Sequence, residues 1–159
     1  MRKIMVVEDS KSVSEYLKKR IEKNLNIKCL TASTKAECEQ LLLLYKNNFE
    51  VALLDLGLPD APNGEVLDIV EGTGIPIVIL TTSVNSEEKF RERDIVDYVV
   101  KEGDYSINYA LNIIKQLVKN KTIKVLVVDD SKFALEKFSH MLEKYNLIFL
   151  ISSTDSPRF

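Results

Sequence analysis

The chain has 159 residues, of which 45% are hydrophobic and 29% are charged, as in ordinary soluble globular proteins. Its formal net charge of -2 gives no overall attraction for nucleic acid or anionic membranes, and we expect neither as a partner. The apolar stretch before Glu8 is too short for a signal peptide, and no stretch approaches a membrane span, so a cytoplasmic location is expected. Cys29 and Cys38 fit neither a disulfide framework nor a zinc spacing, which predicts reduced thiols.

Short β-branched runs alternate with helical patterns from the N-terminus to about residue 120. The predicted strands are residues 3–7, 27–31, 51–54, 76–80 and 96–100. The first predicted helix is capped by Ser10 and runs to Leu25, and the second opens with a capping box at 34–37 and runs through 41–44. A short third helix at 66–70 is closed by Gly72 and Gly74. A polar helix at 87–93 and an amphipathic helix at 107–118 complete the set. Because the strands are almost wholly apolar, they predict a parallel sheet covered on both faces. The fold class is therefore α/β, a doubly wound five-stranded parallel sheet.

The beginning of the chain is repeated near its end. Residues 124–132 mirror residues 3–11, and the echo continues without gaps, so that Ile27 pairs with Ile148. Two copies of one strand–acid pair–helix unit, a whole domain apart, predict tandem domains.

The predicted domains are residues 1–120, complete, and residues 121–159, the truncated start of a second copy. The second copy forms an incomplete βαβ piece whose acid pair is Asp129 and Asp130, and it has no counterpart of Asp55. Its helix carries His140, which we interpret as a plain helix residue. Alone, this piece exposes apolar surface, so it packs on a neighbour, by exchange in a homodimer, or is poorly ordered. The side chains expected on that surface are Val125, Leu126, Phe138 and Leu142.

Chemistry-bearing residues stand where the predicted strands end. Glu8 and Asp9 follow the first strand, Asp55 the third, Thr81 the fourth and Lys101 the fifth. Ligands bind beyond the carboxyl ends of strands in open parallel sheets, so these side chains are expected to converge. Three carboxylates repel one another unless a cation is present, and Mg²⁺ suits an all-oxygen site. Asp55 can then act as a carboxylate nucleophile, with Lys101 and Thr81 stabilising charge on a transferred phosphoryl group.

The same residues resemble the receiver domains of two-component response regulators over residues 1–120. The matching motifs are Glu8-Asp9, Leu53-Leu54-Asp55 with Pro59, residues 76–81, and residues 97–101. The resemblance implies a flavodoxin-like sheet of order 2-1-3-4-5 and phosphorylation of Asp55 by a histidine kinase or phosphotransfer protein. It also implies a magnesium site formed by Glu8, Asp9, Asp55 and the backbone carbonyl of Gly57. Thr81 and Tyr98 would be the conformational switch pair.

Some positions depart from the usual receiver pattern. Glu8 stands where Asp is commoner, Glu102 replaces the usual proline after Lys101, and Thr82 is bulkier than the usual small residue. The loop at residues 60–64 is one residue longer. None of these removes a reacting group, so they bear on the lifetime of the phosphorylated state rather than on its formation.

Two other classes of function compete with the receiver. A pseudo-receiver would signal through its surface without phosphate, and the intact acid pocket speaks against it. A nucleotide-binding or hydrolase domain would need a glycine-rich phosphate loop after the first strand, and the sequence has none there. The tandem arrangement and residues 58–64 resemble the input half of diguanylate cyclases. With no cyclase sequence in it, this chain is not expected to be an enzyme or to make cyclic di-GMP by itself.

Overall fold

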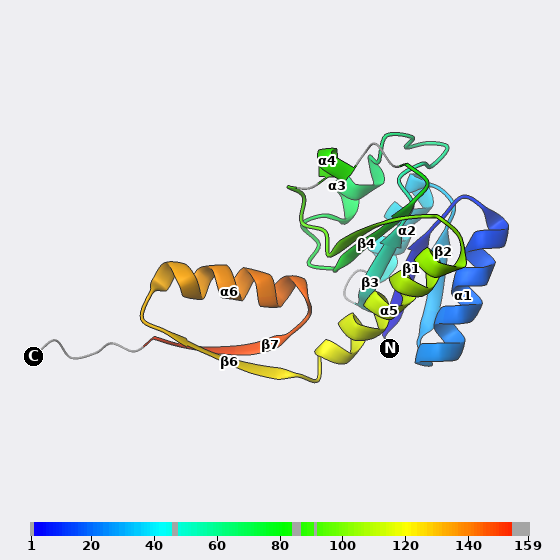
Figure 1. The fold of residues 1–159 in the computed structure, drawn as a ribbon. Coiled ribbons are helices and arrows are strands. Elements are labelled where there is room, and N and C mark those ends of the chain that lie inside the picture. Colours follow the sequence, from blue (N-terminus) through cyan, green and yellow to red (C-terminus); the bar gives the residue numbers. More distant parts are fainter. Residues whose placement is uncertain (1, 46–47, 84–86, 91, 154–159) are drawn as a thin grey trace, which may run out of the picture.

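The computed structural model describes residues 2–45, 48–83, 87–90 and 92–153, and it shows a layered α/β unit followed by a smaller C-terminal unit (Figure 1). The larger sheet is parallel, with the strand order β2-β1-β3-β4-β5. Its strands are β1 (Lys3–Val7), β2 (Lys28–Ala32), β3 (Phe49–Leu54), β4 (Ile77–Thr81) and β5 (Asp97–Val100). The predicted fold class and strand order are confirmed, with strand ends displaced by one or two residues.

Helices cover both faces of this sheet. They are α1 (Lys11–Leu25), α2 (Lys35–Tyr45), α3 (Val66–Val70), α4 (Glu87–Phe90) and α5 (Asp104–Asn120). Alternate residues of β1 enter different cores, since Ile4 packs with α1 and α5, whereas Met5 packs with α2, α3 and α4. Successive strand residues point to opposite faces, so a wholly apolar strand needs helices on both sides. No helix within the described residues has the length and apolar character of a membrane span.

The predicted N-cap positions of α1 and α2 are confirmed, but the side-chain hydrogen bonds at these caps differ from those expected. Ser10 is the N-cap of α1, yet its hydroxyl makes no capping bond, and its own N–H donates to Glu8 Oε1 at 3.2 Å. Thr34 Oγ1 accepts from the Glu37 N–H at 3.1 Å, as a capping box requires. The Glu37 carboxylate, however, accepts from the Ser33 N–H at 2.6 Å rather than from Thr34.

The predicted helix at residues 87–93 is confirmed for Glu87–Phe90 and is wrong at residues 92–93, while residue 91 lies outside the described residues. The chain turns at residues 92–93, and the Arg93 N–H donates to the Phe90 carbonyl at 3.0 Å. The Arg93 guanidinium binds Asp68 in α3 at 2.7 Å and Glu71, the C-cap of α3, at 2.6 Å. Single-sequence periodicity does not detect such ion pairs to another element.

Glycine is required at position 64, in the loop before α3. Its φ of 85° is unfavourable for residues with a Cβ, and a Cβ there would lie 2.8 Å from Phe90 Cζ. The loop after Asp55 therefore lies close against α4. Cys29 and Cys38 are free and buried, as expected, and burial raises the pKa of each thiol to about 12.

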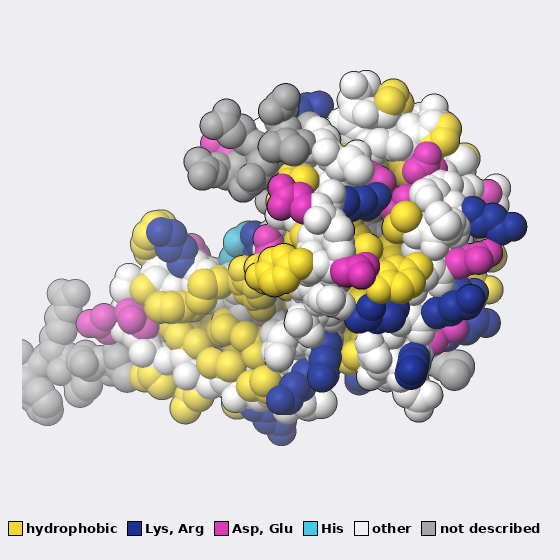
Figure 2. Space-filling model, turned by 45° about the vertical axis from the view of Figure 1, so that its right-hand side comes forward, with side chains coloured by type: hydrophobic (Ala, Val, Ile, Leu, Met, Phe, Trp, Pro, Cys, Tyr) yellow, Lys and Arg dark blue, Asp and Glu magenta, His cyan; other side chains and the backbone are white. Residues whose placement is uncertain are grey.

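The C-terminal unit is a β–α–β piece with its own two-stranded parallel sheet. It comprises β6 (Lys124–Asp129), α6 (Lys132–Lys144) and β7 (Ile148–Ser153). In Figure 1, α6 lies along one face of β6 and β7. Apolar side chains gather on the surface of this unit (Figure 2), and those on the sheet face away from α6 are Leu126, Val128, Ile148 and Leu150.

Two of the four side chains expected on this apolar surface are exposed. Leu126 and Phe138 lie open to solvent, as predicted. Leu142 is buried, contrary to the prediction, because it lies on the inner side of α6. Val125 is half-buried on the strand face next to α6. The helix thus shields one face of its small sheet.

The echo between the two units contains a gap of one residue. Asn26 ends α1 in the left-handed conformation, with φ of 53°, and Asn146 holds the same conformation after α6, with φ of 59°. The strand registers agree, since β1 begins opposite Lys28 and β6 begins opposite Ile148. The predicted gapless pairing of Ile27 with Ile148 is therefore wrong. The segment that joins β6 to β7 is one residue shorter than the segment that joins β1 to β2. The equivalent residues after the gap are Asn26 and Asn146, and the strands that follow them pair in the same register.

Polar contacts attach the C-terminal unit to the first. Asn146 Nδ2 donates to the Glu50 carbonyl at 3.2 Å and to the Leu117 carbonyl at 3.5 Å. Asn120 Nδ2 donates to the Tyr145 carbonyl at 2.8 Å. These contacts lie at the start of β3 and the end of α5, at the amino edge of the larger sheet. The acid cluster stands at the opposite, carboxyl edge.

Candidate functional site

Backbone hydrogen bonds continue past the strand ends and fix the predicted site residues. The Asp55 N–H donates to the Val7 carbonyl at 2.8 Å, which extends the pairing of β3 with β1. The Lys101 N–H donates to the Thr81 carbonyl at 2.8 Å, which extends the pairing of β5 with β4. Both side chains therefore start from positions set by the sheet rather than by a free loop.

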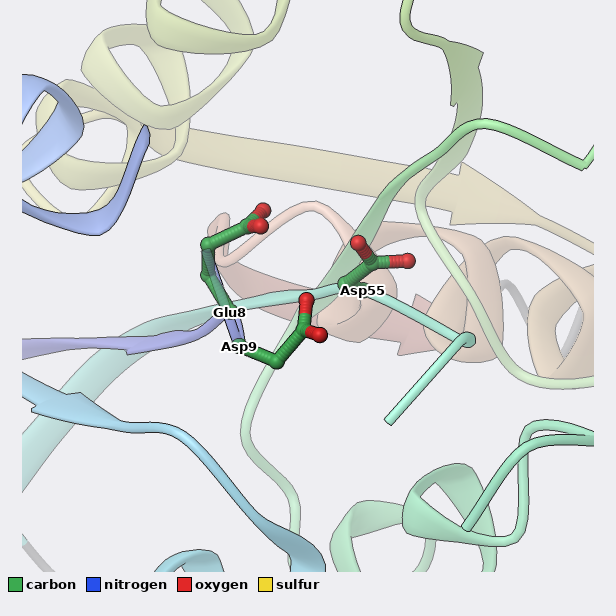
Figure 3. A group of neighbouring side chains, drawn as sticks. All are labelled: Glu8, Asp9 and Asp55. Atoms are coloured by element: carbon green, nitrogen blue, oxygen red, sulfur yellow. The ribbon is translucent and has the colours of Figure 1, made fainter. Parts of the chain in front are cut away.

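Three carboxylates meet beyond β1 and β3 (Figure 3). Oxygens of Glu8, Asp9 and Asp55 lie within 4.8 Å of one another. Glu8 and Asp55 are buried, and Asp9 is exposed. A set of carboxylate oxygens with one side open to water fits a hard divalent cation such as Mg²⁺, which keeps several waters when bound.

Lys101 joins two of these acids. Its Nζ donates to Glu8 Oε2 at 2.6 Å and also to Asp55 Oδ2. Burial alone would lower the pKa of Lys101, but the hydrogen bonds to Asp55 and Glu8 raise it above its ordinary value. Burial raises the pKa of Glu8, and the Lys101 ammonium offsets only part of that effect. The ammonium therefore stays charged beside the carboxylates.

The second oxygen of Asp55 is held by the main chain. Asp55 Oδ1 accepts from the Gly57 N–H at 3.1 Å. The resemblance assigned Gly57 a role through its carbonyl and missed this amide. An Asp side chain often accepts a hydrogen bond from the N–H of the residue two positions later, in an Asx turn. The spacing of Asp55 and Gly57 in the sequence could therefore have predicted this bond.

Thr81 and Tyr98 are linked through Ser83. Thr81 is buried, and its Oγ1 accepts from the Ser83 N–H at 3.4 Å. The Tyr98 hydroxyl donates to the Ser83 carbonyl at 2.7 Å, and its ring stacks on Phe90. No hydrogen bond joins Thr81 to the three acids in the described part of the chain. The main chain of Ser83 thus links the two residues of the predicted switch pair.

Asp60 is a connection that sequence reasoning missed. Its carboxylate accepts from the backbone N–H groups of Lys35 at 2.8 Å and Ala36 at 3.0 Å, at the start of α2. These two hydrogen bonds lower the pKa of Asp60. They join the loop that follows Asp55 to a helix about 25 positions earlier in the sequence. No local sequence pattern predicts hydrogen bonds over that separation.

The second acid pair does not form a comparable cluster. Asp129 Oδ1 accepts from the Ser131 N–H at 2.8 Å, much as Glu8 Oε1 accepts from Ser10 in the first unit. Among the described residues, Asp129 and Asp130 belong to no group of three potential metal ligands. Within the described residues, the second unit therefore repeats the beginning of the site without a counterpart of β3, the strand that precedes Asp55 in the first.

No protein-family model and no curated protein sequence matches the chain. Solved structures do. Two of them are described as response regulator/GGDEF domain proteins, one "putative" and one "probable", and each has a TM-score of 0.80. They are 34% and 33% identical to this chain over 96% of its length. The chain spans 62% of the length of each of them.

Two other similar structures are described as a metal-bound form and a phosphorylated form. The Mn²⁺-bound form of response regulator Rcp1 is 25% identical over 71% of this chain and 91% of its own, with a TM-score of 0.57. The phosphorylated cyanobacterial phytochrome response regulator RcpA is 27% identical over 72% of this chain and 89% of its own, with a TM-score of 0.55. The resemblance to response-regulator receiver domains, including those of GGDEF-containing regulators, is therefore confirmed for this chain.

Proposed function

We propose that this protein is a receiver in which Asp55 accepts a phosphoryl group from a histidine kinase or phosphotransfer protein in a Mg²⁺-dependent reaction. One observation carries the proposal: Asp55 is buried at a strand end, with Lys101 on one carboxylate oxygen and the Gly57 amide on the other. Oxygens of Glu8 and Asp9 lie within 4.8 Å of an Asp55 oxygen, which supports a role for both as metal ligands. A cytoplasmic location accords with this function.

Each residue has a distinct task in the transfer. An oxygen of Asp55 attacks phosphorus, while Lys101 holds the carboxylate in place and neutralises charge on the phosphoryl oxygens. Glu8, Asp9 and the Gly57 carbonyl would hold the cation, which when bound screens the acids and the phosphoryl charge. The Mn²⁺-bound and phosphorylated relatives support both parts of the proposal.

Replacement of the acceptor tests the proposal directly. Asp55→Asn should abolish labelling by acetyl phosphate with Mg²⁺, as measured by intact-protein mass spectrometry. Asp104→Asn, at the exposed start of α5, is the matched control and should label like wild type. A phosphorylated aspartate in Asp55→Asn would contradict the assignment. A wild type that never takes up phosphate would instead favour the pseudo-receiver, a protein-interaction module.

The signal would leave the site through Thr81 and Tyr98. If Thr81 moves toward a phosphoryl group, it shifts Ser83, and the hydrogen bond from Tyr98 to Ser83 must change with it. A downstream output would read that change, and the GGDEF-containing relatives make cyclic di-GMP signalling the favoured output.

We also propose that residues 121–159 begin a second receiver and favour a homodimer of this chain. Within the described residues β6 pairs with β7 alone, while its counterpart β1 has a strand on each side. A free strand edge beside an exposed apolar face is self-complementary about a two-fold axis. Light scattering should show a dimer for the whole chain and a monomer for a chain ending at Asn120. A monomeric whole chain would exclude the exchange.

A further inference from the structure

A cavity of about 390 Å³ lies between α1 and α5, which cover the same face of the larger sheet (Figure 1). α1 begins next to the acid pair, whereas the cavity borders the second half of this helix, from Arg20 to Leu25. The cavity is therefore separate from the acid cluster. Its size is that of a site for a small organic molecule, since ligand pockets start at about 300 Å³.

The Arg20 guanidinium is held in the wall of this cavity by two neutral groups. Its Nη1 donates to the Tyr16 hydroxyl at 2.6 Å, and its Nη2 donates to Asn108 Oδ1 of α5 at 2.6 Å. A guanidinium carries more N–H groups than these two bonds use, so Arg20 can still donate to a ligand. Asn108 turns its oxygen to Arg20, which leaves its Nδ2 donor available. The guanidinium is half-buried and is fixed before any ligand binds.

No acid balances the two cations of the cavity wall, Arg20 and Lys115. Neither forms an ion pair with another described residue, and no carboxylate lines the cavity in that part of the chain. The positions three and four residues from either cation on its own helix, where an acid would pair with it, hold no Asp or Glu. Glu22, two positions after Arg20, instead accepts from the Cys29 N–H of β2 at 3.0 Å. The cavity is therefore electropositive.

The rest of the wall combines amide groups with apolar surface. Asn24 of α1 and Asn112 of α5 are exposed, and each side chain offers N–H donors. Ile21 and Leu111 are buried and supply apolar surface between the two helices. A ligand that matches this wall has an anionic group that accepts hydrogen bonds and a compact apolar part.

We propose that this cavity binds a small phosphate monoester, with its phosphate on Arg20 and Lys115 and its organic group over Ile21 and Leu111. A phosphate monoester is dianionic above a pH of about 6, which matches the two uncompensated cations, whereas a carboxylate would balance only one of them. The guanidinium fork fits a pair of phosphate oxygens, and the lysine adds a point charge. The site needs neither Mg²⁺ nor Asp55, so the inference is independent of the proposed function.

Phenyl phosphate is a suitable probe because it joins a dianionic phosphate to a compact apolar ring. Titrated into the whole chain without Mg²⁺, it should shift the amide resonances of Asn24 and Asn112 in nitrogen-15 NMR spectra. The resonances of Gly57 and Thr81, near the acid cluster, should stay in place. Benzoate, with a similar ring and a single charge, should bind at least about tenfold more weakly, the size expected when a charged hydrogen bond is lost. Inorganic phosphate, which has no ring, should also bind more weakly than phenyl phosphate.

Charge-removing variants show whether the cavity itself is the site. Arg20→Gln should weaken the binding of phenyl phosphate at least about tenfold, because it removes a charged donor. Lys115→Met changes an exposed side chain, keeps the fold and should weaken binding about threefold. Lys119→Met is the matched control, because Lys119 lies one turn further along α5 and does not line the cavity. Its affinity for phenyl phosphate should match that of wild type.

Other results would overturn the site. Equal losses in Lys115→Met and Lys119→Met would mean that the probe is attracted by the general charge of the surface. Benzoate binding as tightly as phenyl phosphate would exclude the recognition of a dianion. Resonance shifts centred on Gly57 and Thr81 would place the probe at the acid cluster, and an absence of any shift would show that the cavity takes no phosphate monoester of this size. None of these results bears on the phosphorylation of Asp55, which the labelling experiment tests by itself.

Discussion

The two β–α–β segments of this chain begin alike and are buried differently. Four of the five residues of β1 are buried, whereas β6 alternates between exposed and half-buried positions. Met5 is 0% exposed, and Leu126, at the same position of the repeat, is 66% exposed. The difference comes from what lies alongside, because α2, α3 and α4 cover the Met5 face and β3 pairs with β1. A strand is thus made a core strand by its neighbours as much as by its own residues.

The acid pairs give the largest expected difference between the two segments. Asp9→Ala should weaken Mg²⁺-dependent binding of beryllofluoride by more than about 100-fold, since even outer-shell changes at metal sites cost about 10–100-fold. Asp130→Ala, the matched change in the second unit, should leave that binding unchanged because Asp130 belongs to no metal-type cluster among the described residues. Fluorine NMR or calorimetric titration would measure both. A comparable loss in Asp130→Ala would mean that the second acid pair contributes to a site.

Sequence reasoning was successful where a local pattern and a sheet rule were sufficient. Apolar runs predict the strands, and the rule that ligands bind at the carboxyl ends of parallel strands predicts that Asp55 and Lys101 lie close together. The geometry of Asp55 and Lys101 agrees with that expectation, although their chemical roles stay predictions. The pairing of Lys101 with Glu8 links residues 93 positions apart through the order of the strands.

The same reasoning failed where one residue or one distant contact decides the outcome. The sequence comparison of the two units missed the one-residue gap after α6, because similar residues still pair when no gap is introduced. The gap becomes apparent from Asn146, which has the same left-handed conformation as Asn26. The predicted helix from Glu87 extends too far, since Arg93 lies in a bend and pairs with Asp68 and Glu71 instead. The attachment of Asp60 to α2 has no sequence signal because its partners are backbone amides, which every residue carries.

Removal of one apolar side chain at matched positions would sharpen the comparison of burial. Met5→Ala should cost about 2–5 kcal/mol of the free energy of unfolding, because it empties a fully buried position. Leu126→Ala should change it by less than about 0.5 kcal/mol, because the side chain is mostly exposed. Urea unfolding followed by circular dichroism gives both values. A large loss in Leu126→Ala that depends on protein concentration would show that a second copy covers this face.

The smallest expected effect concerns the two left-handed asparagines. Glycine keeps the left-handed conformation at either position, so the exchange removes only the side-chain contacts. Asn146→Gly loses hydrogen bonds to the Glu50 and Leu117 carbonyls and should cost about 1 kcal/mol, whereas Asn26→Gly should stay within about 0.5 kcal/mol. Amide exchange in β6 and β7 should then quicken about fivefold in Asn146→Gly alone. Equal effects in the two variants would assign Asn146 a conformational role only, and the attachment of the C-terminal unit would have to depend on other contacts.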